Sequence, residues 1–193
     1  YWACIWDAGG TDTISNSGSS IACTINLNEA PLTGTNAGGY ISSNSGINGG
    51  FTIANGATIE NAIGGSGSDT ITLNSANNEI DGNGGTDTVV FNDTKANVIS
   101  TFGFHHNNTS AIVIKGTYGT DTIVDCENIQ FSDGTISVAD LKTEYSSSYK
   151  PLFANATSGE APFMMADTYT GAVSGIQWQY LAEIGLDGNT VVG

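Results

Sequence analysis

Carboxylate side chains recur at regular spacing in the segment 64–90. This segment divides into three consecutive nonapeptides, GGSGSDTIT, LNSANNEID and GNGGTDTVV. Their sixth positions are Asp69, Asn78 and Asp87, and their eighth positions are aliphatic. The first nonapeptide matches the pattern G-G-x-G-x-D-x-U-x of calcium-binding parallel β-helices in full. The spacing therefore indicates a repeated turn that carries metal ligands.

The repeat predicts how these carboxylates are arranged. Each nonapeptide is expected to form a six-residue turn, followed by a short strand whose aliphatic residue enters the core. Two nonapeptides then complete one coil, so residues eighteen positions apart stack about 4.8 Å apart. Asp69 and Asp87 should face each other on one edge, with Asn78 on the other. Carboxylates that close repel each other unless a cation lies between them, and calcium suits such hard oxygen ligands.

Short β-strands are the elements that must position these side chains. The first two-thirds of the chain consists of runs rich in Ile, Val and Thr, interrupted by Gly, Asn and Asp. The pattern G-[ST]-D-T-[IV] occurs at 10–14, 67–71, 85–89 and 119–123. Helical periodicity is confined to 138–145 and 176–184. The sequence predicts an all-β fold, a parallel β-roll (a right-handed β-solenoid).

The acidic turns allow two other interpretations. In a plain glycine-rich solenoid the same acids would simply be solvated, which explains the full match to the repeat less well. The segment DGNGG at 81–85 begins like an EF-hand loop. Gly85 stands where that loop requires a ligand, however, and the closing glutamate is missing.

The stretches IWDAGGTDTIS (5–15) and ATIENAIGGSGSDTITLNSANNEIDGNGGTDTVVF (57–91) resemble the C-terminal β-roll domain of serralysin-type secreted metalloproteases of the RTX group. The resemblance implies three calcium sites. The first would use Asp7, Gly9 and Asp12, the second Gly10, Asp12, Thr58 and Glu60, and the third Gly65, Gly67, Asp69, Gly82, Gly84 and Asp87. Asn83 replaces the expected second glycine, and the left-handed backbone region tolerates Asn. The repeats end at Val90, which argues against a further site around Asn78.

The chain after the repeats is expected to form two further parts. The predicted organisation is a calcium-binding roll at 1–91, an antiparallel β cap at 92–141, and a linker with a small irregular C-terminal extension at 142–193. Within the cap, GTDTIVDCENIQFSDGT resembles a block that follows RTX repeats, and a hairpin tip is expected at 105–108. The cap would cover the open strand edge of the solenoid. Asp121 has no partner turn nine or eighteen residues away and is interpreted as structural.

Charge and missing motifs exclude several function classes. Four lysines stand against nineteen carboxylates, for a net charge of −15, so nucleic acid is not an expected partner. No apolar run reaches the roughly 20 residues that a membrane span needs. The only histidines, His105 and His106, are adjacent, and no zinc-protease helix, nucleophile elbow, phosphate-binding loop or C-x-x-C pair occurs. The chain thus resembles the accessory domain of the family and not its protease domain, and no enzymatic activity is expected.

The three cysteines are less informative. Cys4 and Cys23 lie in apolar β-type runs that could be neighbouring strands, so the sequence allows a disulfide between them and two free thiols about equally. Cys126 occupies a position suited to an aliphatic side chain and is expected to be buried.

The function expected from these observations is calcium-dependent folding. The chain would stay unfolded at low cytosolic calcium, pass a bacterial type I secretion channel, and fold outside the cell or at its surface as a structural module. The alternative is a binding module that contacts a glycan or a larger protein assembly through the aromatic segment around Trp178 and Tyr180.

Overall fold

The computed structural model describes residues 2–104 and 110–148. The chain divides into two compact units, Tyr1–Lys142 and Thr143–Gly193. The fold described below is that of the first unit. Of the sequence predictions, the hairpin tip with His105 and His106, the helical pattern at 176–184 and the aromatic segment at Trp178 and Tyr180 lie outside the described residues.

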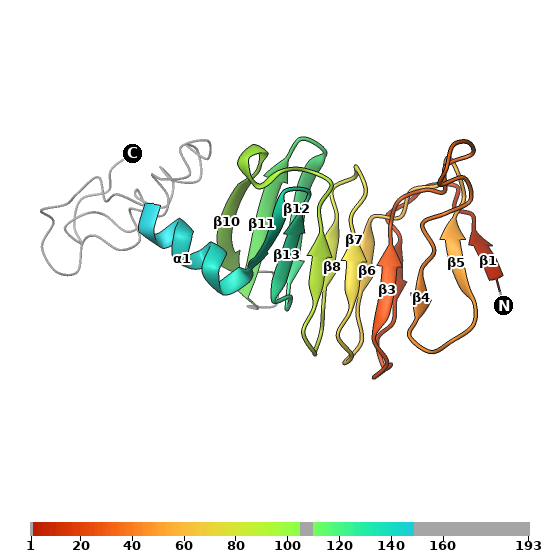
Figure 1. Ribbon diagram of the computed structural model, residues 1–193, viewed down its shortest axis with the longest axis horizontal. Coiled ribbons are helices and arrows are strands. Elements are labelled where there is room, and N and C mark those ends of the chain that lie inside the picture. Colours follow the sequence, from red (N-terminus) through yellow and green to blue (C-terminus); the bar gives the residue numbers. More distant parts are fainter. Residues whose placement is uncertain (1, 105–109, 149–193) are drawn as a thin grey trace, which may run out of the picture. The chain divides into compact units, whose positions relative to one another are not determined.

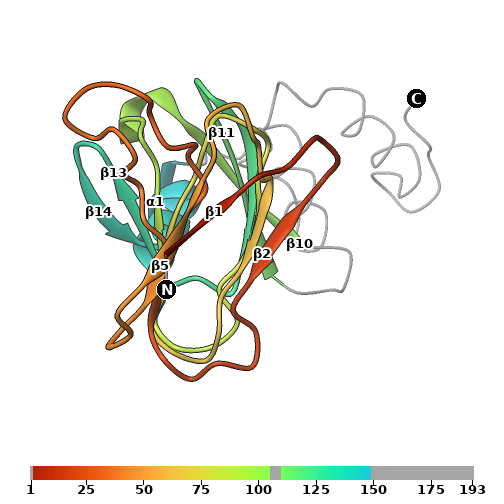
Figure 2. The ribbon, with the colours of Figure 1, turned by 90° about the vertical axis from the view of Figure 1, so that its right-hand side faces the viewer.

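Two six-stranded sheets form the unit and face each other as two layers (Figures 1 and 2). The first sheet contains, in spatial order, β10 (Ile99–Phe104), β11 (Ser110–Gly116), β12 (Gly119–Val124), β8 (Glu79–Asp81), β6 (Asn61–Ile63) and β2 (Thr13–Ser15). The second contains β14 (Gly134–Ser137), β13 (Asn128–Phe131), β9 (Thr88–Val90), β7 (Thr70–Thr72), β3 (Cys23–Asn26) and β4 (Ser43–Asn44). A separate two-stranded sheet joins β1 (Trp2–Ile5) to β5 (Gly50–Ile53).

The repeats form a parallel roll, as predicted. The strands β6, β7, β8 and β9 belong alternately to the first and the second sheet, so the chain changes sheet after every nonapeptide. Within each sheet, residues eighteen apart pair in parallel, such as Asn61 with Glu79 and Thr70 with Thr88. One coil therefore consists of two nonapeptides, and equivalent turns stack directly on one another.

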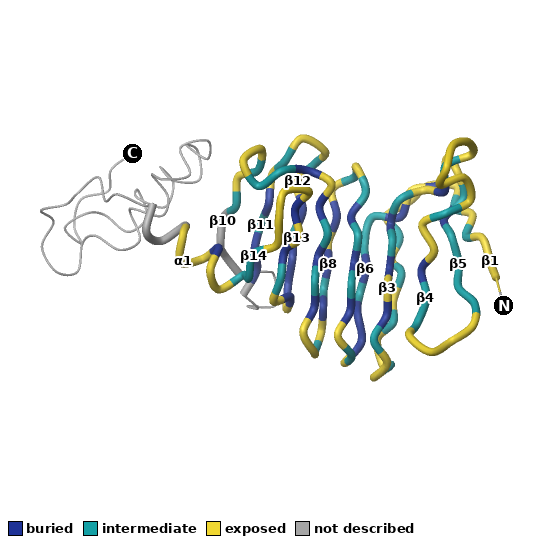
Figure 3. The backbone as a smooth tube through the Cα atoms, in the orientation of Figure 1, coloured by how far each residue is buried: buried dark blue, intermediate teal, exposed yellow. Residues whose placement is uncertain are grey.

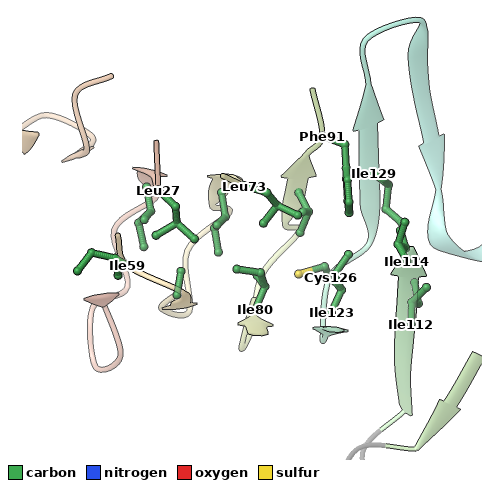
Figure 4. Packing of buried hydrophobic residues seen from close by; sticks show 14 of the residues in the cluster. Leu27, Ile59, Leu73, Ile80, Phe91, Ile112, Ile114, Ile123, Cys126 and Ile129 are labelled. Atoms are coloured by element: carbon green, nitrogen blue, oxygen red, sulfur yellow. The ribbon is translucent and has the colours of Figure 1, made fainter. Parts of the chain in front are cut away.

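The core fills the space between the two sheets. The eighth residues of the nonapeptides, Ile71, Ile80 and Val89, are completely buried. Aliphatic side chains from both sheets point toward each other along the roll (Figure 4), and the turns carry most of the exposed residues (Figure 3). Near the cap, the rings of Phe91 and Phe131 pack with their centroids 5.7 Å apart. Packing against both layers explains why strands of only three residues are stable here.

Two strands of the cap, one in each sheet, add one more parallel coil to the roll, and the other strands of the cap pair with these two in antiparallel fashion. Strand β12 pairs in parallel with β8, placing Ile123 beside Ile80, and β13 pairs in parallel with β9, placing Ile129 beside Val89. In the first sheet, β11 pairs antiparallel with β12, and β10 with β11. In the second sheet, β14 pairs antiparallel with β13. These added strands cover the edge that the last repeat would otherwise expose.

A short helix, α1 (Val138–Ser148), follows β14, and a 3₁₀ turn, η1 (Lys95–Asn97), precedes β10. The hydroxyl of Ser137 accepts the backbone N–H of Asp140 at 3.0 Å and donates to its carboxylate at 2.7 Å, which caps the start of α1. Neither helix among the described residues has the length and apolar character to cross a membrane.

The strand order decides between the two alternatives for Cys4 and Cys23. Strand β1, with Cys4, pairs with β5, whereas β3, with Cys23, pairs with β4 and β7. The two strands belong to different sheets, and both thiols are free, with Cys4 exposed and Cys23 buried. Cys126 is buried against the core, as predicted.

Candidate functional site

One edge of the second sheet carries a row of side chains, one from each of its parallel strands β3, β7, β9 and β13. Each of these successive strands with its turn is here called a rung. Because Thr24 pairs with Thr70, Thr70 with Thr88, and Thr88 with Asn128, the residues preceding them stack on one edge. These residues, here called the Asp69 ladder, are Cys23, Asp69, Asp87 and Glu127. Each carboxylate accepts the backbone N–H of the preceding rung at 2.7 Å, from Cys23 to Asp69, from Asp69 to Asp87 and from Asp87 to Glu127.

The second carboxylate oxygens of Asp69 and Asp87 differ in their partners. Oδ2 of Asp69 accepts the N–H of Gly65 at 2.6 Å and so closes its own turn. In the third nonapeptide, one coil later, the equivalent N–H is that of Asn83, and it donates to the side chain of Asp81 at 2.8 Å instead. Oδ2 of Asp87 is left buried without a hydrogen-bond partner, on a residue that is 1% exposed. A buried carboxylate oxygen with no partner is costly and indicates a missing ligand.

The ladder also disfavours negative charge on Asp87. The pKa of Asp87 is raised to about 6, first by burial and then by the charges of Asp69, Glu127 and Asp81, whereas a hydrogen bond from the backbone of Asp69 acts in the opposite direction. The neighbouring Asp125 has a raised pKa, caused by burial and then by the charges of Asp81 and Glu127. The end of the Asp69 ladder beyond Asp69 therefore carries four carboxylates, those of Asp81, Asp87, Asp125 and Glu127, whose charge a cation would neutralise.

The turns bring all residues of the predicted third site together. Gly84 donates its N–H to the carbonyl of Gly65 at 3.1 Å, which fixes the distance between the two stacked turns. A Cβ on Gly64 would lie 2.6 Å from both Oδ2 of Asp69 and the carbonyl oxygen of Gly82, so only glycine fits there. Asn83 has a φ of 63°, which confirms the predicted left-handed conformation. Gly65, Gly67, Asp69, Gly82, Gly84 and Asp87 thus belong to two adjacent turns.

A second ladder lies on the first sheet. Because Thr13 pairs with Asn61, Asn61 with Glu79, and Glu79 with Thr122, their preceding residues stack in the same way. This Glu60 ladder consists of Asp12, Glu60, Asn78 and Asp121. Glu60 accepts the N–H of Asp12 at 2.9 Å, and Asp121 accepts the N–H of Asn78 at 2.8 Å.

The predicted first and second sites meet at the start of the Glu60 ladder. Asp7 accepts the N–H of Gly9 at 2.8 Å, and a Cβ on Gly10 would lie 3.0 Å from Oδ2 of Asp12. That oxygen is buried without a hydrogen-bond partner. Burial raises the pKa of Asp12, and the nearby charges of Asp7 and Glu60 add to the effect. Thr58 is exposed, two residues before Glu60 in the same turn.

Asp121 occupies a ladder position that the sequence did not reveal. Its partner is Asn78, 43 residues away, because the hairpin tip between β11 and β12 stacks on the turn at 74–78. The N–H of Thr120 donates to the Asn77 side chain at 2.9 Å, and a Cβ on Gly119 would lie 2.8 Å from the carbonyl of Ala76. Burial raises the pKa of Asp121 to about 6. The sequence feature that could have predicted this position is G-T-D-T at 119–122, which matches the pattern of the repeats.

Asp93 shows what a purely structural buried carboxylate looks like in this fold. It accepts hydrogen bonds from the N–H of Thr94 at 2.8 Å, the amide of Asn97 at 2.9 Å and the N–H of Thr117 at 3.0 Å. These bonds, led by those of Thr117, lower the pKa of Asp93 to about 2. Its charge is satisfied by the protein alone, unlike that of Asp87.

Both ladders present only a few potential metal ligands, namely side-chain carboxylates and backbone carbonyls. Within 2–104 and 110–148, no three or more His, Cys, Asp or Glu side chains form a metal-binding group. A cation between stacked turns would therefore be held by two carboxylates and several backbone carbonyls. Such an all-oxygen set fits calcium, which takes six to eight oxygen ligands in flexible geometry, better than zinc.

Comparisons with known proteins agree with this architecture. A family model described as "Peptidase M10 serralysin C terminal" matches residues 2–107. Serralysin C of Dickeya chrysanthemi is 51% identical over 67 residues, which are 35% of this chain and 12% of that protein. Metallopeptidase AprA of Pseudomonas marginalis is 45% identical over 74 residues, 38% of this chain and 14% of that protein. The serralysin of Photorhabdus laumondii is 45% identical over 73 residues, 38% of this chain and 13% of that protein. The matched part is thus a small share of each relative.

Proposed function

Because this chain belongs to the family of peptidase M10 serralysin C-terminal domains, we propose that it is a non-catalytic module that folds when it binds calcium outside the bacterial cell. Its role is then structural, namely secretion in an unfolded form and presentation of a folded roll after export. The proposal assigns calcium to the three sets of residues predicted from the sequence.

The observation that carries this proposal is the pair of buried carboxylate oxygens without partners, Oδ2 of Asp12 and Oδ2 of Asp87. They lie on opposite sheets, each in a ladder beside a second acidic rung, Glu60 for Asp12 and Asp69 for Asp87. Bound calcium would supply positive charge to both ladders and replace the missing hydrogen bonds. The donor set of carboxylates and glycine-turn carbonyls fits that ion.

The protein's own residues explain why the fold would depend on the ion. Without a cation, Asp87 is destabilised by burial and by the charges of Asp69, Glu127 and Asp81. The glycine-rich turns add a large loss of backbone entropy on folding. At low cytosolic calcium these costs would favour the unfolded chain, whereas extracellular modules bind calcium at about 0.1–1 mM and would fold there by linkage.

Circular dichroism of the 193-residue chain tests this directly. We expect the β signal and a cooperative thermal transition in 10 mM calcium, and loss of both in EDTA. Magnesium at the same concentration should restore little, because it demands tighter octahedral geometry and dehydrates reluctantly. A spectrum and melting temperature that do not change on chelation would refute calcium-dependent folding.

A further inference from the structure

We propose that the roll holds one more calcium ion than the repeats predict, at the junction between the turn 82–86 and the segment 125–127 of the cap. Its ligands are Oδ2 of Asp87, the carboxylate of Glu127 and the carbonyl oxygen of Asp125. The inference extends the proposed calcium dependence to residues outside every repeat, and its test separates the two.

The junction repeats the geometry of the predicted third site one rung later. In the third site, Asp87 accepts the N–H of Asp69 at 2.7 Å, and at the junction Glu127 accepts the N–H of Asp87 at the same distance. The carbonyl of Asp81 accepts the N–H of Gly64 at 2.8 Å, and that of Val124 accepts the N–H of Gly82 at 3.0 Å. Asp125, which follows Val124, thus stacks on Gly82 as Gly82 stacks on Gly64.

The oxygen atoms around the two glycines correspond as well. A Cβ on Gly64 would lie 2.6 Å from Oδ2 of Asp69 and 2.6 Å from the carbonyl of Gly82. A Cβ on Gly82 would lie 2.8 Å from Oδ2 of Asp87 and would clash with the carbonyl of Asp125. The pair formed by a carboxylate oxygen and a carbonyl oxygen is therefore present at both rungs, although 125–127 has no repeat sequence.

The two oxygens of Asp87 serve different rungs. Oδ1 bonds the backbone of Asp69 and belongs to the third site. Oδ2 lies against Gly82, on the side where the Asp125 carbonyl approaches, and it is the oxygen that is buried without a partner. Because Asp87 is 1% exposed, water cannot freely solvate this oxygen, and an ion at the junction would complete its contacts.

The surroundings select a hard cation. Asp81 and Asp125 add two carboxylates close to Glu127, and Asp125 keeps a left-handed φ of 48° that is uncommon for a non-glycine residue. The sulfur of Cys126 would lie 2.9 Å from a Cβ on Gly82, but its thiol donates to the carbonyl of Val124 at 3.3 Å. The available ligand atoms are thus oxygens, which favours calcium over zinc.

The test counts bound calcium in the full chain by equilibrium dialysis at saturating calcium. Glu127→Gln keeps an acceptor for the N–H of Asp87 but loses the charge, so it should bind one ion fewer than the native chain. Glu79→Gln removes a charge from an exposed residue of β8 and is the matched control, which should bind the native number. Circular dichroism in calcium verifies that each sample is folded.

A second comparison does not depend on Glu127. Asp69 borders only the third site, whereas Asp87 borders both, so Asp69→Asn should lose one ion and Asp87→Asn two. If Glu127→Gln binds the native number, or if Asp69→Asn and Asp87→Asn lose equal numbers, the junction site does not exist and the proposed function stands. If the native chain binds no calcium, the proposed function itself fails.

Discussion

Replacing Asp87 by Asn should change stability in opposite directions with and without calcium. The pKa of Asp87 is raised from 3.8 to about 6 in the folded chain. The folded state therefore binds the extra proton between these values, and stability falls as pH rises through about 4 to 6. At pH 7.4 the whole penalty of the charge is present. A shift of about 2 pKa units corresponds to about 3 kcal/mol, which solvent screening reduces to about 1–2 kcal/mol.

Asn removes this penalty and still offers an oxygen to the N–H of Asp69. We therefore expect Asp87→Asn to stabilise the calcium-free fold by about 1–2 kcal/mol. In calcium the sign reverses, because each site occupied at a concentration 100 times its Kd contributes about 2.7 kcal/mol to the native chain. The variant loses that contribution at every site that Asp87 borders.

Urea denaturation at pH 7.4, followed by circular dichroism in EDTA and in 10 mM calcium, measures both signs. Trimethylamine oxide added to all samples populates the folded form without calcium. Asp93→Asn is the matched control, since Asp93 is buried but fully hydrogen-bonded by the protein. It should destabilise the chain equally in both conditions. Equal destabilisation by Asp87→Asn in EDTA and calcium would show that Asp87 is only a hydrogen-bond acceptor.

Three further outcomes are expected. Asp121→Asn should stabilise the chain at pH 7.4 by up to about 3 kcal/mol, equally with and without calcium, because burial raises the pKa of Asp121 to about 6. The gain should vanish below about pH 4, and a urea series that shows no such pH dependence contradicts it. A thiol reagent should modify only Cys4 in calcium, since Cys23 and Cys126 are buried, and all three thiols in EDTA; rapid reaction of Cys126 in calcium would argue against the packing described. Ser137→Ala should cost about 1 kcal/mol in both conditions through loss of the helix cap, and an unchanged urea midpoint would show that the cap adds nothing.

The roll itself could be predicted because its information is local and periodic. A nonapeptide sets one turn and one strand, so the spacing of Asp69 and Asp87 already implied that Thr70 pairs with Thr88. The left-handed conformation of Asn83 followed from the same register. Each inference needed only the chemistry of a turn and the two-residue period of a strand.

The continuation of the roll into the cap could not be read in this way. Asp121 and Glu127 stack on residues 43 and 40 positions away, because a hairpin inserted between the rungs removes any fixed offset. The pairing of β1 with β5 is equally non-local, so the sequence left open whether Cys4 lies beside Cys23. Strand register across long connections depends on tertiary packing, which a local pattern does not encode.

The order of residues along each ladder restricts where the proposed ions could bind. A site needs acidic side chains on two adjacent rungs, because one carboxylate and a few carbonyls leave too little negative charge to hold calcium. In the Asp69 ladder this excludes the gap between Cys23 and Asp69, since burial and the nearby Asp69 raise the pKa of Cys23 to about 12 and keep its thiol neutral. The requirement for two adjacent acids is met on both sides of Asp87, between Asp69 and Asp87 and between Asp87 and Glu127.

In the Glu60 ladder the same rule gives a different result. Asp12 and Glu60 are adjacent acids, but Asn78 separates Glu60 from Asp121 and donates its amide to the carbonyl of Glu60 at 2.8 Å and to the side chain of Asn74 at 2.8 Å. The amide thus supplies by hydrogen bonds the contacts that a cation would supply at the proposed sites. If the roll binds calcium as proposed, a neutral rung at this position would let it continue into the cap without a further ion, whereas the opposite edge, with acids on three successive rungs, would need one at each step.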